Sequence, residues 1–400
     1  MQDSSLTPLP RFALDTLLPL CRDRFADPLH GGFHEQLDRA HVPVPLGTKR
    51  LMVQCRQLYV LAHAALLGDA SGQDAAARGY DFLRRAYRDP AQGGWFFRAA
   101  ADGTPADRSK DLYAHAFLLF ALAWLHRAFA APDAIPLASA TYDTLLDRMA
   151  APNGGFWDRA DAHWQPDRAL RRQNPHMHLL EGLLALHAAT GDARWRDAAD
   201  HLIRLFLDRL HDPATATLGE FFTADWTPHP EQGEIVEPGH HFEWVWLLHR
   251  YTAQGGTLPV LAAADGLFTM ATRHGFDAET GGIHDQIDRA GMPLATTRRI
   301  WPVCEAIKAH IARQEDGWPV PAGQPAALVA HLFRDFLRPA ESGWVETCAR
   351  DGTPTHATLP GSTPYHVFLA AAELARVAAP GAVRPGRSPS EPAGPPGRSR

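Results

Sequence analysis

The chain has 400 residues, of which 45% are hydrophobic, and its formal net charge is −6. This composition supports a large buried core, and the small negative charge excludes the basic surface expected of a protein that binds nucleic acid or an anionic membrane. No segment reaches membrane-spanning length and Met1–Arg11 lacks the pattern of a secretory signal, so we expect no association with a membrane.

The four cysteines are scattered along the chain and show no CxxC spacing. Such a distribution is typical of a reducing, cytoplasmic protein and argues against a disulfide framework or a structural zinc site. The cysteines are Cys21, Cys55, Cys304 and Cys348.

A short glycine-containing motif recurs six times, which indicates a repeat protein. The second residue of the motif falls at 32, 94, 155, 219, 282 and 343, with spacings of 62, 61, 64, 63 and 61 residues. Glycine pairs and Asp-Gly steps beside aromatic residues favour short hairpins or tight loops. The copies begin Gly31-Gly-Phe-His, Gly93-Gly-Trp-Phe, Gly154-Gly-Phe-Trp, Leu218-Gly-Glu-Phe, Gly281-Gly-Ile-His and Ser342-Gly-Trp-Val.

Helical periodicity fills the segments between the motifs. An amphipathic stretch precedes each motif and a more apolar stretch follows it, which predicts an all-α fold: an (α/α)6 barrel of six helix pairs with short hairpin loops, spanning 1–378. A two-domain helical solenoid is the alternative. Residues 379–400 are rich in Pro, Gly, Ser and Arg and are predicted to be disordered. The predicted helices are Arg11–Arg24, Leu51–Leu67, Ala75–Tyr87, Leu112–Ala128, Ser139–Met149, Met177–Ala189, Trp195–Leu210, Phe242–Thr252, Pro259–Arg273, Pro302–Arg313, Ala326–Leu337 and Tyr365–Val377.

Each repeat places polar or aromatic residues 19 to 24 positions after its reference glycine, where an inner helix begins. If the helices close into a barrel, these residues meet at one end of its axis. Prolines start four of the inner helices, and Asn174 and Thr363 have side chains suited to helix capping. The converging residues are Arg56, Tyr113, His115, His178, His240, Trp301, Glu305 and His366.

His240 lies in the first turn of a helix that begins near Pro238, and Glu243 follows on the same face. The positive end of the helix dipole lowers a histidine pKa and favours neutral imidazole, whereas a nearby carboxylate pulls the other way. The expected consequence is a histidine positioned to move protons.

The residue types suit acid–base chemistry on a sugar. Histidine is the residue type that ordinarily titrates near neutrality, which makes His178, His240 and His366 candidates for acid–base groups, and Arg56 is a permanent cation able to hold an oxyanion. The structural alternatives are packing for the histidines and Tyr113, and a salt bridge for Arg56. A metal site is permitted by the spacings, but no HExxH motif or carboxylate cluster supports one, so we predict neither metal nor cofactor. Aromatic faces, hydroxyls and carboxylates for the ligand would come from Tyr113, Trp301, Tyr365, Glu243 and Glu305.

The ordered set of motifs resembles the N-acylglucosamine 2-epimerase superfamily, which includes mannose isomerases, sulfoquinovose isomerase and cellobiose 2-epimerases. The resemblance extends to about residue 377 and implies an (α/α)6 barrel with metal-free chemistry on a reducing sugar. The matching stretches are Cys55-Arg-Gln-Leu-Tyr, Lys110-Asp-Leu-Tyr, Asn174-Pro-His-Met-His-Leu-Leu-Glu, Pro238-Gly-His-His-Phe-Glu-Trp, Trp301-Pro-Val-Cys-Glu-Ala and Tyr365-His.

By this similarity, the sugar opens, loses its C2 proton and passes through a cis-enediolate. His366 would carry the proton between C2 and C1, and His240 would be the second acid–base group. Arg56 would stabilise the enediolate oxygen and His178 would bind the O1/O2 region, while Glu243 would tune His240. The expected substrate-binding residues are Tyr113, Glu243, Trp301, Glu305, Tyr365, His115 and Glu181.

The sequence favours the isomerase branch. Trp244 stands where the epimerases tend to carry a small residue, and the single Trp301 departs from the Trp-Trp pair associated with cellobiose epimerases. We therefore expect isomerisation of an unphosphorylated monosaccharide such as mannose to fructose, by a monomer or homodimer. The alternatives are 2-epimerisation, a glycoside hydrolase built on Glu243 and Glu305, and a non-catalytic carbohydrate-binding barrel; Arg298 and Arg299 would favour an anionic substituent.

Overall fold

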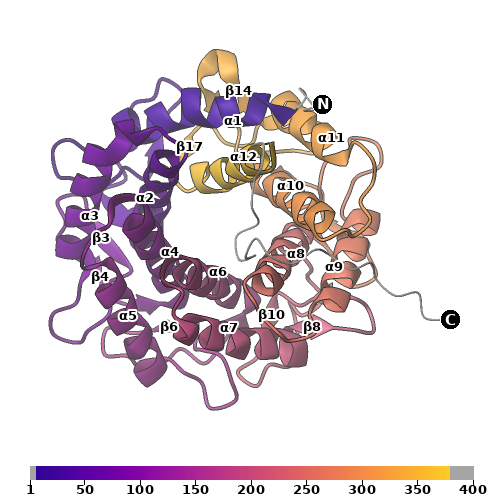
Figure 1. Ribbon diagram of the computed structural model, residues 1–400, viewed down its shortest axis with the longest axis horizontal. Helices are drawn as coiled ribbons and strands as arrows, with labels where there is room; N and C mark the ends of the chain where they lie inside the picture. The colour runs from indigo at the N-terminus through magenta and orange to yellow at the C-terminus, as the bar shows by residue number, and fades with distance from the viewer. Residues whose placement is uncertain (1–5, 379–400) are drawn as a thin grey trace.

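A computed structural model describes residues 6–378, so the predicted disordered tail, 379–400, lies outside the described residues. Within this range the chain forms twelve α-helices in two concentric rings (Figure 1). All the predicted helical stretches are helical. The inner ring consists of α2 (Leu51–Leu66), α4 (Leu112–Phe129), α6 (Gln173–Thr190), α8 (Pro238–Ala253), α10 (Ile300–Glu315) and α12 (Pro364–Ala378).

The outer helices precede the inner ones in the chain, and three of them continue into π-helical turns before they end. The outer ring consists of α1 (Pro8–Phe12) with η2 (Ala13–Leu17) and η3 (Leu20–Phe25), α3 (Gln73–Tyr87), α5 (Ala134–Arg148), α7 (Ala193–Leu205) with η5 (Phe206–Leu210), α9 (Leu261–His274), and α11 (Gln324–His331) with η6 (Leu332–Phe336). Two short 3₁₀ turns, η4 (Ala70–Gly72) and η7 (Pro339–Glu341), complete the helical elements of the described chain.

The two rings follow from the distribution of apolar residues. Outer helices such as α3 bury one face, whereas inner helices such as α4 are buried almost all round. Inner helices approach closely where a small residue allows it. A Cβ added to Gly182 of α6 would lie 3.0 Å from the carbonyl oxygen of Ala116 in α4, so glycine sets the distance between these two helices.

Helix α4 has the length and apolar composition of a membrane-crossing helix, with a mean hydropathy of 1.3. The expectation that no segment reaches this length was therefore wrong. Because 72% of this segment is buried among the other helices, its place in the inner ring accounts for its composition.

Seventeen short strands lie in the loops of the described chain, and many pair with a strand of the neighbouring repeat rather than within their own loop. The strands are β1 (Gln36–Leu37), β2 (Thr48–Arg50), β3 (Arg98–Ala100), β4 (Pro105–Asp107), β5 (Lys110–Asp111), β6 (Arg159–Ala160), β7 (Arg171–Arg172), β8 (His211–Asp212), β9 (Thr217–Leu218), β10 (Phe221–Phe222), β11 (Gln286–Ile287), β12 (Pro293–Ala295), β13 (Arg298–Arg299), β14 (Leu337–Arg338), β15 (Gly343–Trp344), β16 (Thr347–Cys348) and β17 (Leu359–Pro360).

These antiparallel pairs link each repeat to the next. The residues before an inner helix pair with the loop of the following repeat in β2–β3, β5–β6, β7–β10 and β13–β16, and a bridge between Val236 and Ile287 makes the corresponding link. The pair β1–β17, with Gln36 opposite Pro360, joins the first repeat to the last. The loops at the ends where the inner helices begin therefore form a closed, hydrogen-bonded ring.

The backbone corrects the register that the sequence suggested for the fourth repeat. A residue with left-handed backbone recurs at Gly31, Gly93, Gly154, Ala216, Gly281 and Ser342, with φ between 47° and 94°. The equivalent of Gly32 is therefore Thr217 rather than Gly219. In this repeat Ala216 and Thr217 stand where the other repeats have the glycine pair or its equivalent. The sequence pattern therefore selected Gly219, which lies two residues after the true position.

Candidate active site

A pocket of about 190 Å³ opens where the inner helices begin. It is smaller than the ~300–1,000 Å³ of pockets that hold drug-sized ligands, which suits a monosaccharide. Seven of the predicted site residues line it: Arg56, Tyr113, His178, His240, Glu243, Trp301 and His366. A neighbouring basin of about 450 Å³ shares Tyr113 and Asn174 with this pocket and leads outward past Arg50, Arg159 and Arg172.

His366 is held as a neutral base. Its Nδ1 lies 2.8 Å from Oε1 of Glu305, which leaves Nε2 without a partner among the described side chains. Burial, followed by the positive charges of Arg56 and Lys308, lowers its pKa well below the usual value. Because Glu305 fixes one nitrogen, the other can accept a proton from a molecule in the pocket.

His240 is held in the opposite protonation state. Burial lowers its pKa, but the carboxylates of Glu220 and Glu237 outweigh burial and raise it to about 9. Nδ1 lies 2.9 Å from Oε2 of Glu220 and 3.6 Å from Oε2 of Glu237. In the sequence the helix dipole stood against one nearby carboxylate, and in the structure two carboxylates, Glu220 and Glu237, decide the outcome in favour of the protonated form. His240 is an acid at neutral pH.

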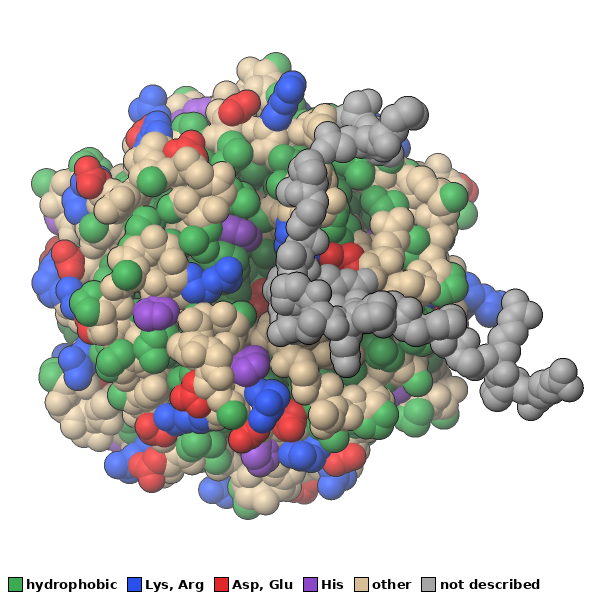
Figure 2. All heavy atoms as spheres, in the orientation of Figure 1, with side chains coloured by type: hydrophobic (Ala, Val, Ile, Leu, Met, Phe, Trp, Pro, Cys, Tyr) green, Lys and Arg blue, Asp and Glu red, His purple; other side chains and the backbone are tan. Residues whose placement is uncertain are grey.

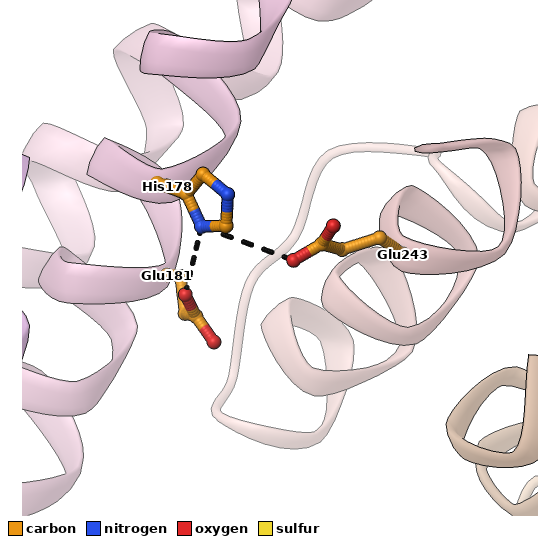
Figure 3. A group of neighbouring side chains, drawn as sticks. All are labelled: His178, Glu181 and Glu243. Atoms are coloured by element: carbon orange, nitrogen blue, oxygen red, sulfur yellow. Dashed lines mark hydrogen bonds and ion pairs between the residues drawn. The ribbon is translucent and has the colours of Figure 1, made fainter. Parts of the chain in front are cut away.

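His178 lies between two glutamates from different helices (Figure 3). Its Nδ1 is 3.1 Å from Oε2 of Glu181 and 3.8 Å from Oε1 of Glu243. Burial lowers the pKa of His178 to about 4, although Glu181 opposes the shift. Burial and then the charge of Glu305 raise the pKa of Glu243 well above its usual value, and its carboxyl group faces the pocket.

Arg56 supplies the positive charge of the pocket. It donates to the Tyr113 hydroxyl at 2.7 Å and to the Ser362 carbonyl at 3.2 Å, and its guanidinium lies over the rings of Phe117 and Tyr365. Among the described arginines that line the pocket and the basin, the others each pair with a carboxylate. These pairs are Arg50–Glu35, Arg159–Asp111, Arg172–Asp158 and Arg299–Asp285.

Trp301 brings the two opposed histidines together. Its ring centroid lies 4.9 Å from that of His240 and 5.7 Å from that of His366. The indole packs against the first turn of α8, where a Cβ added to Gly239 would come within 2.5 Å of it. Glycine at this position therefore allows one aromatic face to border both an acid and a base.

Three predicted site residues lie behind the pocket. Glu305 is fully buried and contacts His366, while Glu181 accepts from His178 and from the Tyr365 hydroxyl at 2.6 Å. Tyr365 therefore contacts Glu181 rather than presenting its hydroxyl to the pocket. Glu305 does not line the pocket, which argues against a hydrolase pair with Glu243 there.

The structure places His115 outside the site. Its Nε2 accepts the N–H of Trp95 at 3.2 Å and its Nδ1 bonds the Asp111 carbonyl at 2.7 Å. Other repeats make the same hydrogen bond, in which a side chain of the inner helix accepts the backbone N–H that follows the left-handed turn. Gln54 accepts from Phe33, His176 from Phe156, and His241 from Leu218. The high histidine count thus reflects a repeated structural position as well as the site.

The sequence analysis did not identify Glu220, Lys308, Glu237 or Glu346. In each repeat one residue of the loop pairs with the end of the preceding outer helix, as Phe33 does with Ala26. In the corrected register Glu220 belongs to a series of acidic residues that lie two positions after this paired residue: Glu35, Asp158, Glu220, Asp285 and Glu346. Each contacts the start of an inner helix, through Arg50, Arg172, His240, Arg299 and Thr363 respectively. This series was the available signal, and the false register at Gly219 concealed it.

Two further sequence interpretations change. Asn174 is the second residue of α6, whose N-cap is Arg172, so the predicted cap at Asn174 was wrong. Trp244 is fully buried and donates to Gln173 at 2.7 Å. It does not line the pocket, so the size of its side chain does not limit the pocket directly.

The family profile described as N-acylglucosamine 2-epimerase (GlcNAc 2-epimerase) matches residues 31–370. The chain belongs to the N-acylglucosamine 2-epimerase family. It is an isomerase of this family and acts on a small-molecule sugar.

The names of the related proteins include both isomerases and 2-epimerases. The chain is 34% identical over 380 residues to a mannose-6-phosphate isomerase of Rhizobium meliloti, covering 90% of this chain and 94% of that protein. It is 32% identical over 359 residues to a D-mannose isomerase of Thermobifida fusca, covering 84% and 86%. The solved cellobiose 2-epimerase of Spirochaeta thermophila matches with a TM-score of 0.84 and 26% identity, covering 93% and 96%.

Two buried clusters of three side chains each bring together possible ligands for a cation. The donor atoms of His178, Glu181 and Glu243, and those of Glu243, Glu305 and His366, lie within 4.8 Å of one another. Every one of these side chains except Glu243 already makes a hydrogen bond to a protein group. The absence of a required metal remains a prediction, which activity after chelation tests.

Proposed function

We propose that this chain is an aldose–ketose isomerase that converts an unphosphorylated monosaccharide, D-mannose to D-fructose, through ring opening and a cis-enediolate. The observation that carries this proposal is the pairing of a neutral base, His366, with a protonated acid, His240, beside one pocket and one indole. The two rings of helices support assignment of the fold as an (α/α)6 barrel of six repeats.

The reaction moves protons without changing the atoms of the sugar. His366 Nε2 removes the proton from C2 of the open aldose and returns it to C1, while O2 releases its proton to solvent and O1 takes one up from solvent. His240 donates a proton to the ring oxygen when the sugar opens. The Arg56 cation stabilises the enediolate oxygen, and His178 and Glu243 bind the O1/O2 region.

The charge pattern around the pocket supports a neutral sugar. A phosphate group attracts arginine, but the described arginines of the pocket and basin other than Arg56 are already paired with carboxylates. Arg298, a candidate for an anionic substituent, pairs with Asp335 at 2.6 Å. The name of the Rhizobium meliloti relative makes D-mannose 6-phosphate the necessary comparison substrate.

Epimerisation at C2 is the second candidate. The protonated His240 borders the same pocket as His366 and could return a proton to the opposite face of C2. The likeness to the cellobiose 2-epimerase of Spirochaeta thermophila supports this alternative.

The test is proton NMR of each sugar with EDTA-treated protein in D2O. D-mannose should yield fructose with deuterium at C1, and D-mannose 6-phosphate should react at least about tenfold more slowly. His366→Asn should remove the exchange without loss of folding. Formation of the 2-epimer from N-acetylglucosamine, glucose or cellobiose, with no ketose, would replace the isomerase proposal by the epimerase one. No exchange with any sugar would reject both.

A further inference from the structure

A buried lysine lies behind the base of the pocket. Glu305 uses its two oxygens for different partners: Oε1 lies 2.8 Å from His366 Nδ1, and Oε2 lies 2.5 Å from Lys308 Nζ. Lys308 is fully buried, and its ammonium group lies 4.1 Å from the ring centroid of Trp246. Lys308, Glu305 and His366 thus form a continuous chain from the interior to the pocket.

The charges around Lys308 show why a cation is needed there. Burial lowers the pKa of Lys308, but the charges of Glu305, Glu243 and Glu181 outweigh burial and raise it. Burial raises the pKa of Glu305, and Lys308 is the first group that opposes this shift. The other ionisable groups near this layer are Arg56 on α2, His178 on α6, His240 on α8, and Tyr365 on α12.

We propose that Lys308 is a positioning residue that selects the catalytic tautomer of His366 through Glu305. With Lys308 present, Glu305 is a carboxylate and accepts the Nδ1–H of His366, so that Nε2 reaches the pocket with a free lone pair. Without the ammonium group, Glu305 takes a proton from solvent and donates it toward Nδ1, while the imidazole proton moves to Nε2. That tautomer cannot remove a proton from C2.

The link to catalysis rests on the proposed function, in which His366 is the base, but the tautomer itself can be observed without turnover. Lys308→Met removes the charge and retains much of the side-chain volume. We expect kcat to fall by about 10²–10⁴-fold with KM within about threefold of wild type, because substrate contacts are unchanged. In 15N NMR, the His366 resonance, assigned by its absence from His366→Asn, should change from Nδ1–H to Nε2–H.

Two glutamine variants keep the test decisive if Lys308→Met does not fold. Removing both partners of a buried ion pair is less disruptive than removing one. In Glu305→Gln the amide can present its oxygen to Nδ1–H without needing a cation. The proposal requires Glu305→Gln and the double variant Glu305→Gln/Lys308→Met to agree within about twofold in kcat and to share the same His366 tautomer. A larger difference would mean that Lys308 acts by another route.

Lys110→Met is the matched control, because Lys110 is also fully buried and lies 2.6 Å from the carboxylate of Asp89. Lys110→Met should lower the stability of the protein. The His366 tautomer and kcat should remain as in the wild-type protein. Nδ1–H retained in Lys308→Met with wild-type kcat would overturn the proposal. If no sugar reacts with the wild-type protein, the function fails, but the NMR comparison still accepts or rejects the role of Lys308.

Discussion

Nδ1 of His240 lies 2.9 Å from Oε2 of Glu220, although Glu220 lies in a loop and His240 lies in the first turn of α8, 20 residues later. Glu220 also accepts from Gln173 of the preceding inner helix at 2.9 Å. The second acid–base group of the pocket is therefore controlled by a loop residue that two repeats hold in position.

We expect the alkaline limb of the kcat profile to reflect His240. Its pKa of about 9 predicts loss of activity as the pH rises through that value. Because the folded-state pKa is raised, its contribution to stability is complete below about pH 6.5 and is lost between there and about pH 9. Glu220→Gln should move the alkaline limb to lower pH. Glu35→Gln, at the same repeat position but paired with Arg50, should not move it.

Enlarging Gly239 should displace Trp301. A methyl group there would lie 2.5 Å from the indole, so Gly239→Ala should lower kcat/KM by at least about tenfold, since small misplacements in an active site are costly. Adding Trp301→Phe should restore thermal stability by relieving the clash. Steady-state kinetics and thermal unfolding of both variants check this; unchanged kinetics in Gly239→Ala would show that the indole position does not matter.

His115 should be replaceable by glutamine, because Gln54 performs the same backbone contact in the first repeat. His115→Gln should retain activity. His115→Ala leaves the N–H of Trp95 without a partner and should lower the free energy of unfolding by about 1–3 kcal/mol. Urea unfolding and the isomerase assay measure the two effects; a large fall in kcat in His115→Gln would return His115 to the site.

The end of the inner ring where the inner helices finish should determine how the free energy of unfolding changes at acid pH. A cavity of about 910 Å³ lies there, and Figure 2 shows a hollow at the centre of one face of the molecule. Burial raises the pKa of Glu373, but Arg250 and Arg376 outweigh it and lower the pKa to about 2. This contribution to stability is present above about pH 4.5 and is lost as the pH falls toward 2.

Glu373→Gln should therefore lower the free energy of unfolding at pH 7 by about 3 kcal/mol, the lower end of the range for breaking a buried ion pair, since Arg250 keeps only Glu315 at 3.6 Å. The difference from wild type should shrink as the pH falls from 4.5 to 2. Urea unfolding at several pH values measures it. Asp143→Asn breaks an exposed pair with Arg194 and should cost less than about 1 kcal/mol. A pH-independent difference would assign the loss to packing instead.

Helix positions and most pocket residues could be predicted from the sequence, because apolar periodicity and repeat spacing are local signals. Arg56, Tyr113 and His366 lie about the same distance after their loops, and the chain places them together. The strand pairs between repeats left no comparable signal, because each strand is only two or three residues long.

The controlling residues behind the pocket could not be predicted in the same way. Glu220 was hidden because Gly219 shifted the apparent register of one repeat by two residues. Lys308 follows Glu305 by three residues within a helix whose apolar sequence indicates burial. Such a pair is also typical of a helix surface, so only the packed structure distinguishes a buried ion pair from a solvated one.

The pairing of β1 with β17 limits how this scaffold can diverge. In an open array, duplication of one unit lengthens the molecule and leaves the existing interfaces intact. Here an added helix pair would separate Gln36 from Pro360 and widen the central axis around which the pocket residues lie. New specificities must therefore arise by substitution and by insertion in the loops, while the number of units stays constant.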